Sequence, residues 1–162
     1  MNAKIAQAMN EQVVFEFNAA YLYLAMSLEM EKQKYSGFAK WLNLQYQEEM
    51  THAGKFVKYL QDRDEVVTLG DIKAQAVTFD SPLACAKAVQ AHEELITSKI
   101  HALYALALEE KDYASSEFLS FFVKEQVEEE ANARDLVDQF TFAGDNKPAQ
   151  MFVDAKLGGR QQ

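Results

Sequence analysis

The feature that most constrains the fold of this chain is the unequal length of the three gaps between four long, helically periodic segments. Only two prolines and six glycines interrupt the 162 residues, so apolar residues recur at helical spacing over long runs. Ser81 followed by Pro82 is a helix N-cap with proline at the first helical position, and Gly144 is suited to closing the fourth segment. We expect helices at residues 3–34, 38–63, 81–111 and 115–143, and a short fifth helix at 148–157.

The gaps predict how these helices are connected. The first and third gaps are only a few residues long, which makes the helices that they join antiparallel neighbours. Residues 64–81 form the middle gap, which extended would span roughly 60 Å, whereas a helix of about 27 residues is only about 40 Å long. The middle gap can therefore cross the whole bundle and make the second and third helices parallel. The sequence predicts one all-α domain over residues 1–162, an antiparallel four-helix bundle with one long crossover loop and a short C-terminal fifth helix.

Each long helix carries an acidic residue near the middle of its apolar row. The rows follow spacings of three and four residues, which place their members on one face of a helix. None of the rows contains a lysine or an arginine. The rows are Met9, Val13, Glu16, Ala20, Tyr23 and Ser27; Phe38, Leu42, Gln45, Glu49, His52, Phe56 and Leu60; Ala86, Val89, Glu93, Ile96, Ile100, Leu103 and Ala107; and Leu119, Phe122, Gln126, Glu129, Ala133, Leu136 and Phe140.

Four carboxylates that face one another inside a core need compensating charge. Burying even one unpaired carboxylate costs several kcal/mol, so the four must be protonated or bind cations. Two divalent cations would balance them. The alternative is that these acids lie at helix edges and reach solvent, which explains one acid well but explains poorly four acids in four apolar rows. We therefore expect Glu16, Glu49, Glu93 and Glu129 to converge with His52 on a metal site.

The donor types narrow the choice of metal. Four carboxylates, one imidazole from His52 and the amide of Gln126 form a hard, oxygen-rich set without thiolate. This set suits iron or manganese. Calcium would not favour the histidine, and zinc sites are more often richer in histidine or cysteine.

Charge and hydropathy limit the partners. The chain has 25 acidic against 16 basic residues and a net charge of −9, which repels nucleic acid and favours cations. Stretches between charged residues are too short for a membrane-spanning helix, and residues 1–10 lack the apolar part of a signal peptide. We expect a cytoplasmic protein with neither a nucleic-acid nor a membrane partner. Cys85 is the only cysteine, which excludes an intrachain disulfide and a thiolate zinc cluster.

From Asn10 to Gly144 the chain resembles the bacterial non-haem ferritins. A lone Glu-x-x-His is common, but four matching strings in this order on four helices are specific. Ferritin-like folds are also a known case of a bundle with one long crossover. The strings are Asn10-Glu11-Gln12 leading to Glu16, Glu48-Glu49-Met50-Thr51-His52, His92-Glu93-Glu94-Leu95-Ile96-Thr97, and Glu125-Gln126-Val127-Glu128-Glu129-Glu130.

The resemblance implies iron storage and detoxification. A ferritin of this kind is a ferroxidase, which oxidises Fe(II) with O₂ or H₂O₂ at a di-iron centre and deposits ferric mineral inside a hollow shell of twenty-four identical subunits. By position, Glu16, Glu49 and His52 would hold the first iron. Glu49 would bridge to a second iron, which Glu93 and Glu129 would also bind.

Further residues acquire expected roles from the same resemblance. Gln126 would lie beside the two irons and orient O₂ or a bound water, and Tyr23 would hydrogen-bond a ligand or supply an electron. A third iron site would use Glu48, Glu125 and Glu128.

The sequence departs from bacterioferritin, which repeats Glu-x-x-His on the fourth helix where this chain has Gln126-x-x-Glu129. Met50 matches the position from which bacterioferritins ligate haem, but non-haem ferritins can also carry methionine there. The resemblance therefore implies a ferritin-like iron site without haem.

Three other protein classes fit the sequence less well. A di-iron oxidase or peroxidase of the rubrerythrin kind normally has an electron-transfer domain with cysteine pairs, which one cysteine cannot supply. A ribonucleotide reductase subunit would normally be far longer. A metal-free helical interaction module would expose its acids, whereas here they interrupt apolar rows.

Overall fold

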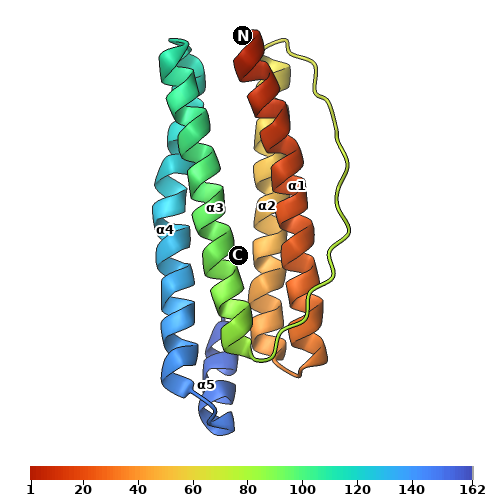
Figure 1. The fold of residues 1–162 in the computed structure, drawn as a ribbon, viewed down its shortest axis with the longest axis vertical. Helices are drawn as coiled ribbons and strands as arrows, with labels where there is room; N and C mark the ends of the chain where they lie inside the picture. Colours follow the sequence, from red (N-terminus) through yellow and green to blue (C-terminus); the bar gives the residue numbers. More distant parts are fainter. Residues whose placement is uncertain (162) are drawn as a thin grey trace.

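The protein is a bundle of four long helices with a fifth, short helix across one end (Figure 1). The computed structural model describes residues 1–161, and in that range it contains no β-strand. None of the described helices is both long and apolar enough to cross a membrane. The predicted all-α class is confirmed. The helices are α1 (Ala3–Lys32), α2 (Ser36–Asp62), α3 (Pro82–Glu109), α4 (Tyr113–Ala143) and α5 (Lys147–Leu157).

Several helix ends differ by one or two residues from the approximate bounds expected from the sequence. α1 ends at Lys32 instead of residue 34 because Lys34 has a left-handed backbone, with φ 71°. In the same way Lys111, with φ 56°, follows the end of α3. α4 begins at Tyr113 instead of residue 115, because the carboxylate of Asp112 accepts from the backbone N–H of Ser115 and caps the helix.

The start of α2 depends on a residue from the other end of the chain. The sequence predicted that the second helix begins at about residue 38, but α2 already begins at Ser36. The Asp154 carboxylate on α5 accepts hydrogen bonds from the backbone N–H groups of Gly37 at 3.2 Å and Phe38 at 2.8 Å. These bonds satisfy two of the donors that a helix N-terminus leaves free. Helix α5 therefore caps α2.

The crossover runs along the outside of the bundle beside α1 (Figure 1). It joins the end of α2 to the start of α3 and makes these two helices parallel, as the length of the gap predicts. Asn10 bonds the backbone of Val66 and Thr68, and Asn18 bonds the backbone of Asp71 and Lys73. Two asparagines of α1 thus hold the crossover in place.

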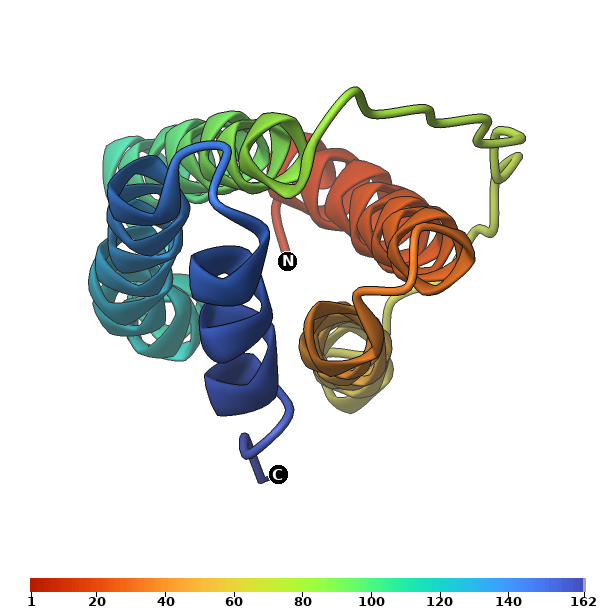
Figure 2. The ribbon, with the colours of Figure 1, turned by 90° about the horizontal axis from the view of Figure 1, so that it is seen from below.

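The core consists of two apolar clusters stacked along the bundle. The cluster around Phe38, Leu42 and Phe140 packs near α5, and the cluster around Phe56 and Leu119 fills the other half. Viewed along the bundle, the helices surround a common axis and α5 covers one end (Figure 2). Every residue of the four predicted rows is buried. The acids of the rows belong to neither cluster and form a polar layer within the bundle.

Candidate metal centre

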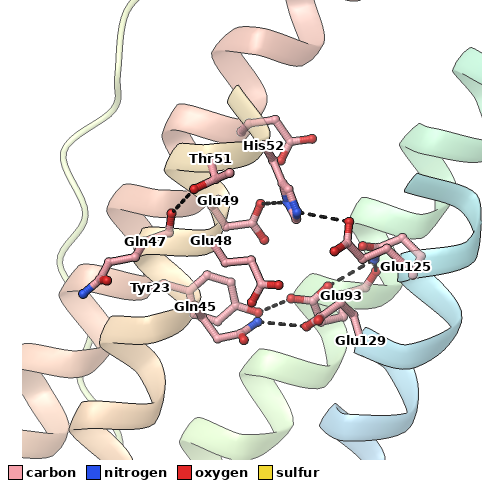
Figure 3. A network of polar contacts seen from close by, with 12 residues as sticks. Tyr23, Gln45, Gln47, Glu48, Glu49, Thr51, His52, Glu93, Glu125 and Glu129 are labelled. Atoms are coloured by element: carbon pink, nitrogen blue, oxygen red, sulfur yellow. Dashed lines mark hydrogen bonds and ion pairs between the residues drawn. The ribbon is translucent and has the colours of Figure 1, made fainter. Parts of the chain in front are cut away.

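Four buried carboxylates, one from each long helix, make up the polar layer. Glu16 on α1, Glu49 on α2, Glu93 on α3 and Glu129 on α4 are at most 7% exposed. They lie mid-helix because each takes an apolar position in its row, where neighbouring turns are anchored in the core. Figure 3 shows the side chains of Glu49, Glu93 and Glu129 pointing toward the space between the helices.

Glu16, Glu49 and His52 form a compact group of possible ligands. One donor atom from each lies within 4.8 Å of the other two. Nδ1 of His52 is 3.1 Å from a carboxylate oxygen of Glu49. Gln12, one turn before Glu16, donates a hydrogen bond of 2.7 Å to one oxygen of that carboxylate. The other oxygen, Oε2, is buried without a hydrogen-bond partner, and a cation would satisfy it.

Glu93 and Glu129 are held by hydroxyl and amide donors. The Tyr23 hydroxyl donates to one oxygen of Glu93, and the Gln126 amide donates to the other at 3.1 Å. Glu129 accepts a hydrogen bond of 2.9 Å from the Gln45 amide. These neutral donors fix the direction of the carboxylates without cancelling their charge. Both carboxylates therefore remain able to bind metal.

A second group of possible ligands adjoins the first and shares His52 with it. Donor atoms of Glu48, His52 and Glu125 lie within 4.8 Å of one another. Nε2 of His52 is 3.2 Å from Oε2 of Glu125, an ion-pair distance without the alignment of a hydrogen bond. Glu128, which the sequence places in the same third site, is exposed on α4 and lies outside this group.

Burial favours the protonated forms of the acids in this layer when no cation is bound. Burial, followed by the charge of Glu49, raises the pKa of Glu16 well above its usual value. Burial raises the pKa of Glu93 to about 7 and also raises the pKa of Glu129. Burial disfavours the charged form of His52, but its contacts with Glu125 and Glu49 outweigh this and raise its pKa to about 11. Metal binding would have to displace protons from these groups.

The donor set fits two divalent cations. In the described part of the chain no lysine or arginine forms an ion pair with Glu16, Glu49, Glu93 or Glu129. Four carboxylates and one imidazole supply oxygen and nitrogen donors on one side and balance four positive charges. Glu16, Glu49 and His52 lie close enough together to share one cation, whereas Glu93 and Glu129 belong to neither group of possible ligands.

Three supporting residues were not assigned a role from the sequence. Gln12 precedes Glu16 by four residues, a spacing that could have marked it as a donor, whereas Gln45 donates to Glu129 on another helix. Arg160 follows α5 and donates to Oε1 of Gln45 at 2.5 Å and to Oε2 of Glu48 at 3.0 Å. No periodic pattern predicts that contact, because Arg160 lies more than a hundred positions from either partner.

Every comparison with known proteins reported below matches a ferritin. The ferritin-like domain family matches residues 6–143. A bacterial non-heme ferritin of Bacteroides fragilis is 38% identical over 160 residues, 99% of each chain. One of Staphylococcus epidermidis is 36% identical over 99% of this chain and 96% of the relative. The crystal structure of an open-pore ferritin from Archaeoglobus fulgidus superposes with a TM-score of 0.98 at 38% identity, covering 99% of both chains.

Proposed function

This chain belongs to the ferritin family, and from that membership we propose that it oxidises ferrous iron at the buried carboxylate centre and stores the ferric product. The relatives are named as non-heme ferritins and cover nearly the whole chain. The observation that carries the proposal is the layer of four buried carboxylates, one per helix, none of which forms an ion pair with a lysine or arginine among the described residues. Residues 1–162 would act as one ferritin-like domain.

We assign one set of ligands to each of two ferrous ions. Glu16, Glu49 and His52 would hold the first ferrous ion, and Glu49 would bridge to the second, which Glu93 and Glu129 would also hold. Nδ1 of His52 faces Glu49, so this nitrogen is placed to bind iron. Nε2 could then donate its proton toward Glu125, which would fix the ring orientation.

Oxidation would draw one electron from each ferrous ion. O₂ takes up the two electrons and two protons to give hydrogen peroxide, and peroxide can accept two more electrons and two more protons to give two water molecules. The total charge of the metal pair rises from four to six, which exceeds the charge of the four carboxylates. Water must then supply hydroxide or oxide to the ferric product, which releases protons and favours its departure as mineral.

Gln126 and Tyr23 would support this chemistry on the side of the second ion, where Glu93 lies. Both donate to Glu93 in the metal-free protein, and their polar groups therefore already point at the centre. Gln126 would orient O₂ or a water molecule. Tyr23 would hydrogen-bond a ligand or supply an electron. A third iron would bind at Glu48 and Glu125, with Glu128 turning inward from the surface to complete the site.

Storage requires a closed space, and the surface supports assembly. Several large apolar side chains are strongly exposed, among them Leu28 at 65%, Phe142 at 93% and Phe152 at 76%. Apolar groups exposed to this degree are typical of surfaces that a partner covers. We propose a cytoplasmic shell of twenty-four identical subunits, with Fe²⁺ and O₂ or H₂O₂ as substrates and no haem.

The test is aerobic addition of ferrous iron to the purified apoprotein, with ferric absorbance recorded over time and the product sized by gel filtration with iron analysis. We expect rapid oxidation of about two irons per chain, followed by many more irons eluting with a large shell. Slow background oxidation with iron precipitating would remove both the oxidase and the storage proposals.

A pair of variants tests the site itself. Glu49→Ala removes the proposed bridge and should abolish rapid oxidation while the helical fold, measured by circular dichroism, is retained. Glu94→Ala is the control, because Glu94 is an exposed glutamate on α3 directly beside Glu93. This variant should oxidise iron as fast as the unmodified chain. Unchanged kinetics in Glu49→Ala would overturn the ligand assignment.

A further inference from the structure

We propose that Arg160 is a positioning residue that pairs with the Glu48 carboxylate when no metal is bound. Arg160 must leave Glu48 before a third cation can bind that carboxylate. This inference rests on the proposed function, since it concerns the third site of the same centre. It assigns a role to the C-terminal segment after α5.

Arg160 is held in place by several independent contacts. One guanidinium nitrogen donates to the backbone oxygen of Trp41 at 3.5 Å and to Gln45, while the other donates to Glu48 at 3.0 Å. The guanidinium carbon lies 4.9 Å from the centre of the Trp41 ring. Lys40 anchors the segment just before it by donating to the backbone oxygen of Gly158 at 2.9 Å.

The position of Arg160 places a permanent positive charge at the edge of the third site. An arginine side chain cannot lose its proton at physiological pH and has no acceptor. Glu48 is the acid that Arg160 neutralises, and Glu48 is also a member of the ligand group with His52 and Glu125. A cation bound by Glu48 and Arg160 paired with Glu48 therefore compete for the same carboxylate.

The same side chain orients a ligand of the second ion. Arg160 can only donate, so the Gln45 amide must turn its oxygen toward Arg160. Its nitrogen then faces Glu129. The hydrogen bonds thus run from Arg160 through Gln45 to Glu129. When Arg160 leaves Glu48, this chain of bonds also loses its anchor.

The surroundings allow Arg160 to move. The side chains of Arg160 and Glu48 are 26% and 31% exposed, so the pair is reachable from solvent. A cavity of about 340 Å³ adjoins it, lined in part by Leu44 and Thr51. A hydrated cation can approach Glu48 through this space, and the displaced guanidinium can turn into water.

The fluorescence of Trp41 can report the displacement of Arg160. Trp41 is the only tryptophan, it is 8% exposed, and the Arg160 guanidinium covers its ring. Departure of Arg160 changes the charge and the solvent next to the indole. Trp41 emission should therefore change as the third site fills.

The experiment titrates the apoprotein with Zn²⁺, a redox-inactive probe, by calorimetry and by Trp41 fluorescence. The unmodified chain should bind three ions, with the emission change at the third. Arg160→Gln should bind the third ion roughly three- to fivefold more tightly, which corresponds to a partly exposed ion pair, and should lack the emission change. Arg160→Lys keeps the charge and should resemble the unmodified chain.

A double-mutant cycle separates competition at Glu48 from a general loss of structure. In a Glu48→Gln background, Arg160→Gln should have no further effect on Zn²⁺ affinity at the third site, because the contested carboxylate is already neutral. Equal third-site affinity in the unmodified chain and Arg160→Gln would overturn the inference. So would binding of only two ions, which leaves the proposed di-iron centre intact. Absence of the first two ions would overturn the proposed function and this inference with it.

Discussion

Substitution of Gly37 by alanine should destabilise the protein, although alanine normally favours helices. Gly37 lies in the first turn of α2, and a Cβ added there would be 1.9 Å from the backbone oxygen of Asp154 and 2.7 Å from its carbonyl carbon. An ordinary contact needs about 3.4 Å, so α5 must move by roughly 1.5 Å, the difference of the two distances. The obstructing atoms are backbone and cannot rotate away.

The cost follows from the bonds that this shift breaks. The Asp154 carboxylate accepts from the N–H groups of Gly37 and Phe38, and a bond to a charged group contributes about 1.5–3 kcal/mol. The higher helix propensity of alanine offsets about 0.5–1 kcal/mol of this loss of stability. We expect Gly37→Ala to lose roughly 2–4 kcal/mol, which lowers the Tm of a domain of this size by about 5–15 °C.

Gly54→Ala is the matched control in the same helix. Gly54 is exposed in the middle of α2, and a Cβ there would meet nothing within 4 Å. Only the propensity effect remains, so this variant should gain about 0.5–1 kcal/mol. Thermal unfolding followed by circular dichroism compares the two. If Gly37→Ala were as stable as Gly54→Ala, α5 would not pack against the start of α2 as described.

Three further predictions concern the centre and α5. Burial raises the pKa of Glu93 from 4.5 to about 7, so its stabilising contribution is complete below about pH 4.5 and is lost, by about 3 kcal/mol, as pH rises through about 7. Urea unfolding of the metal-free chain should show this fall, Glu93→Gln should reduce it, and an unchanged slope in that variant would contradict the assignment. Tyr23→Phe removes a donor to Glu93 and should cost about 1–3 kcal/mol; stopped-flow absorbance should show slower iron oxidation at the same two-ion stoichiometry, and an unaltered rate would exclude a role for the hydroxyl. Asp154→Ala removes both bonds to the start of α2 and should lower stability by about 3–6 kcal/mol, whereas Asp154→Asn keeps an acceptor and should lose less; equal losses in thermal unfolding would argue against capping.

The helices and the buried acids could be predicted because they depend on local periodicity. A residue three or four positions from a buried neighbour shares its face, so Glu16, Glu49, Glu93 and Glu129 were found by their place in apolar rows. The length of the crossover constrained the topology in the same way. Ser81 caps α3 through its side chain, as its position before Pro82 indicates.

The contacts that depend on distant parts of the chain could not be predicted. Gly37 was interpreted as a break between helices, yet it lies inside α2 and gives α5 room to approach. Asp154 caps α2 across 116 positions, and Arg160 reaches the centre from a segment without periodicity. Each contact is set by how α5 packs against the bundle, which no local pattern specifies.

The separation of the core into two apolar clusters explains how the chain can keep a layer of acids between them. The helices are held on both sides of the acids by buried aromatic and aliphatic residues. Burial raises the pKa of Glu16 and of Glu93, so ionising these two acids at neutral pH should oppose folding when no cation is bound. Exchange of such an acid for its amide should therefore stabilise the metal-free protein while weakening metal binding. Acids retained for packing would give the opposite sign, because their loss would destabilise the chain whether or not metal was present.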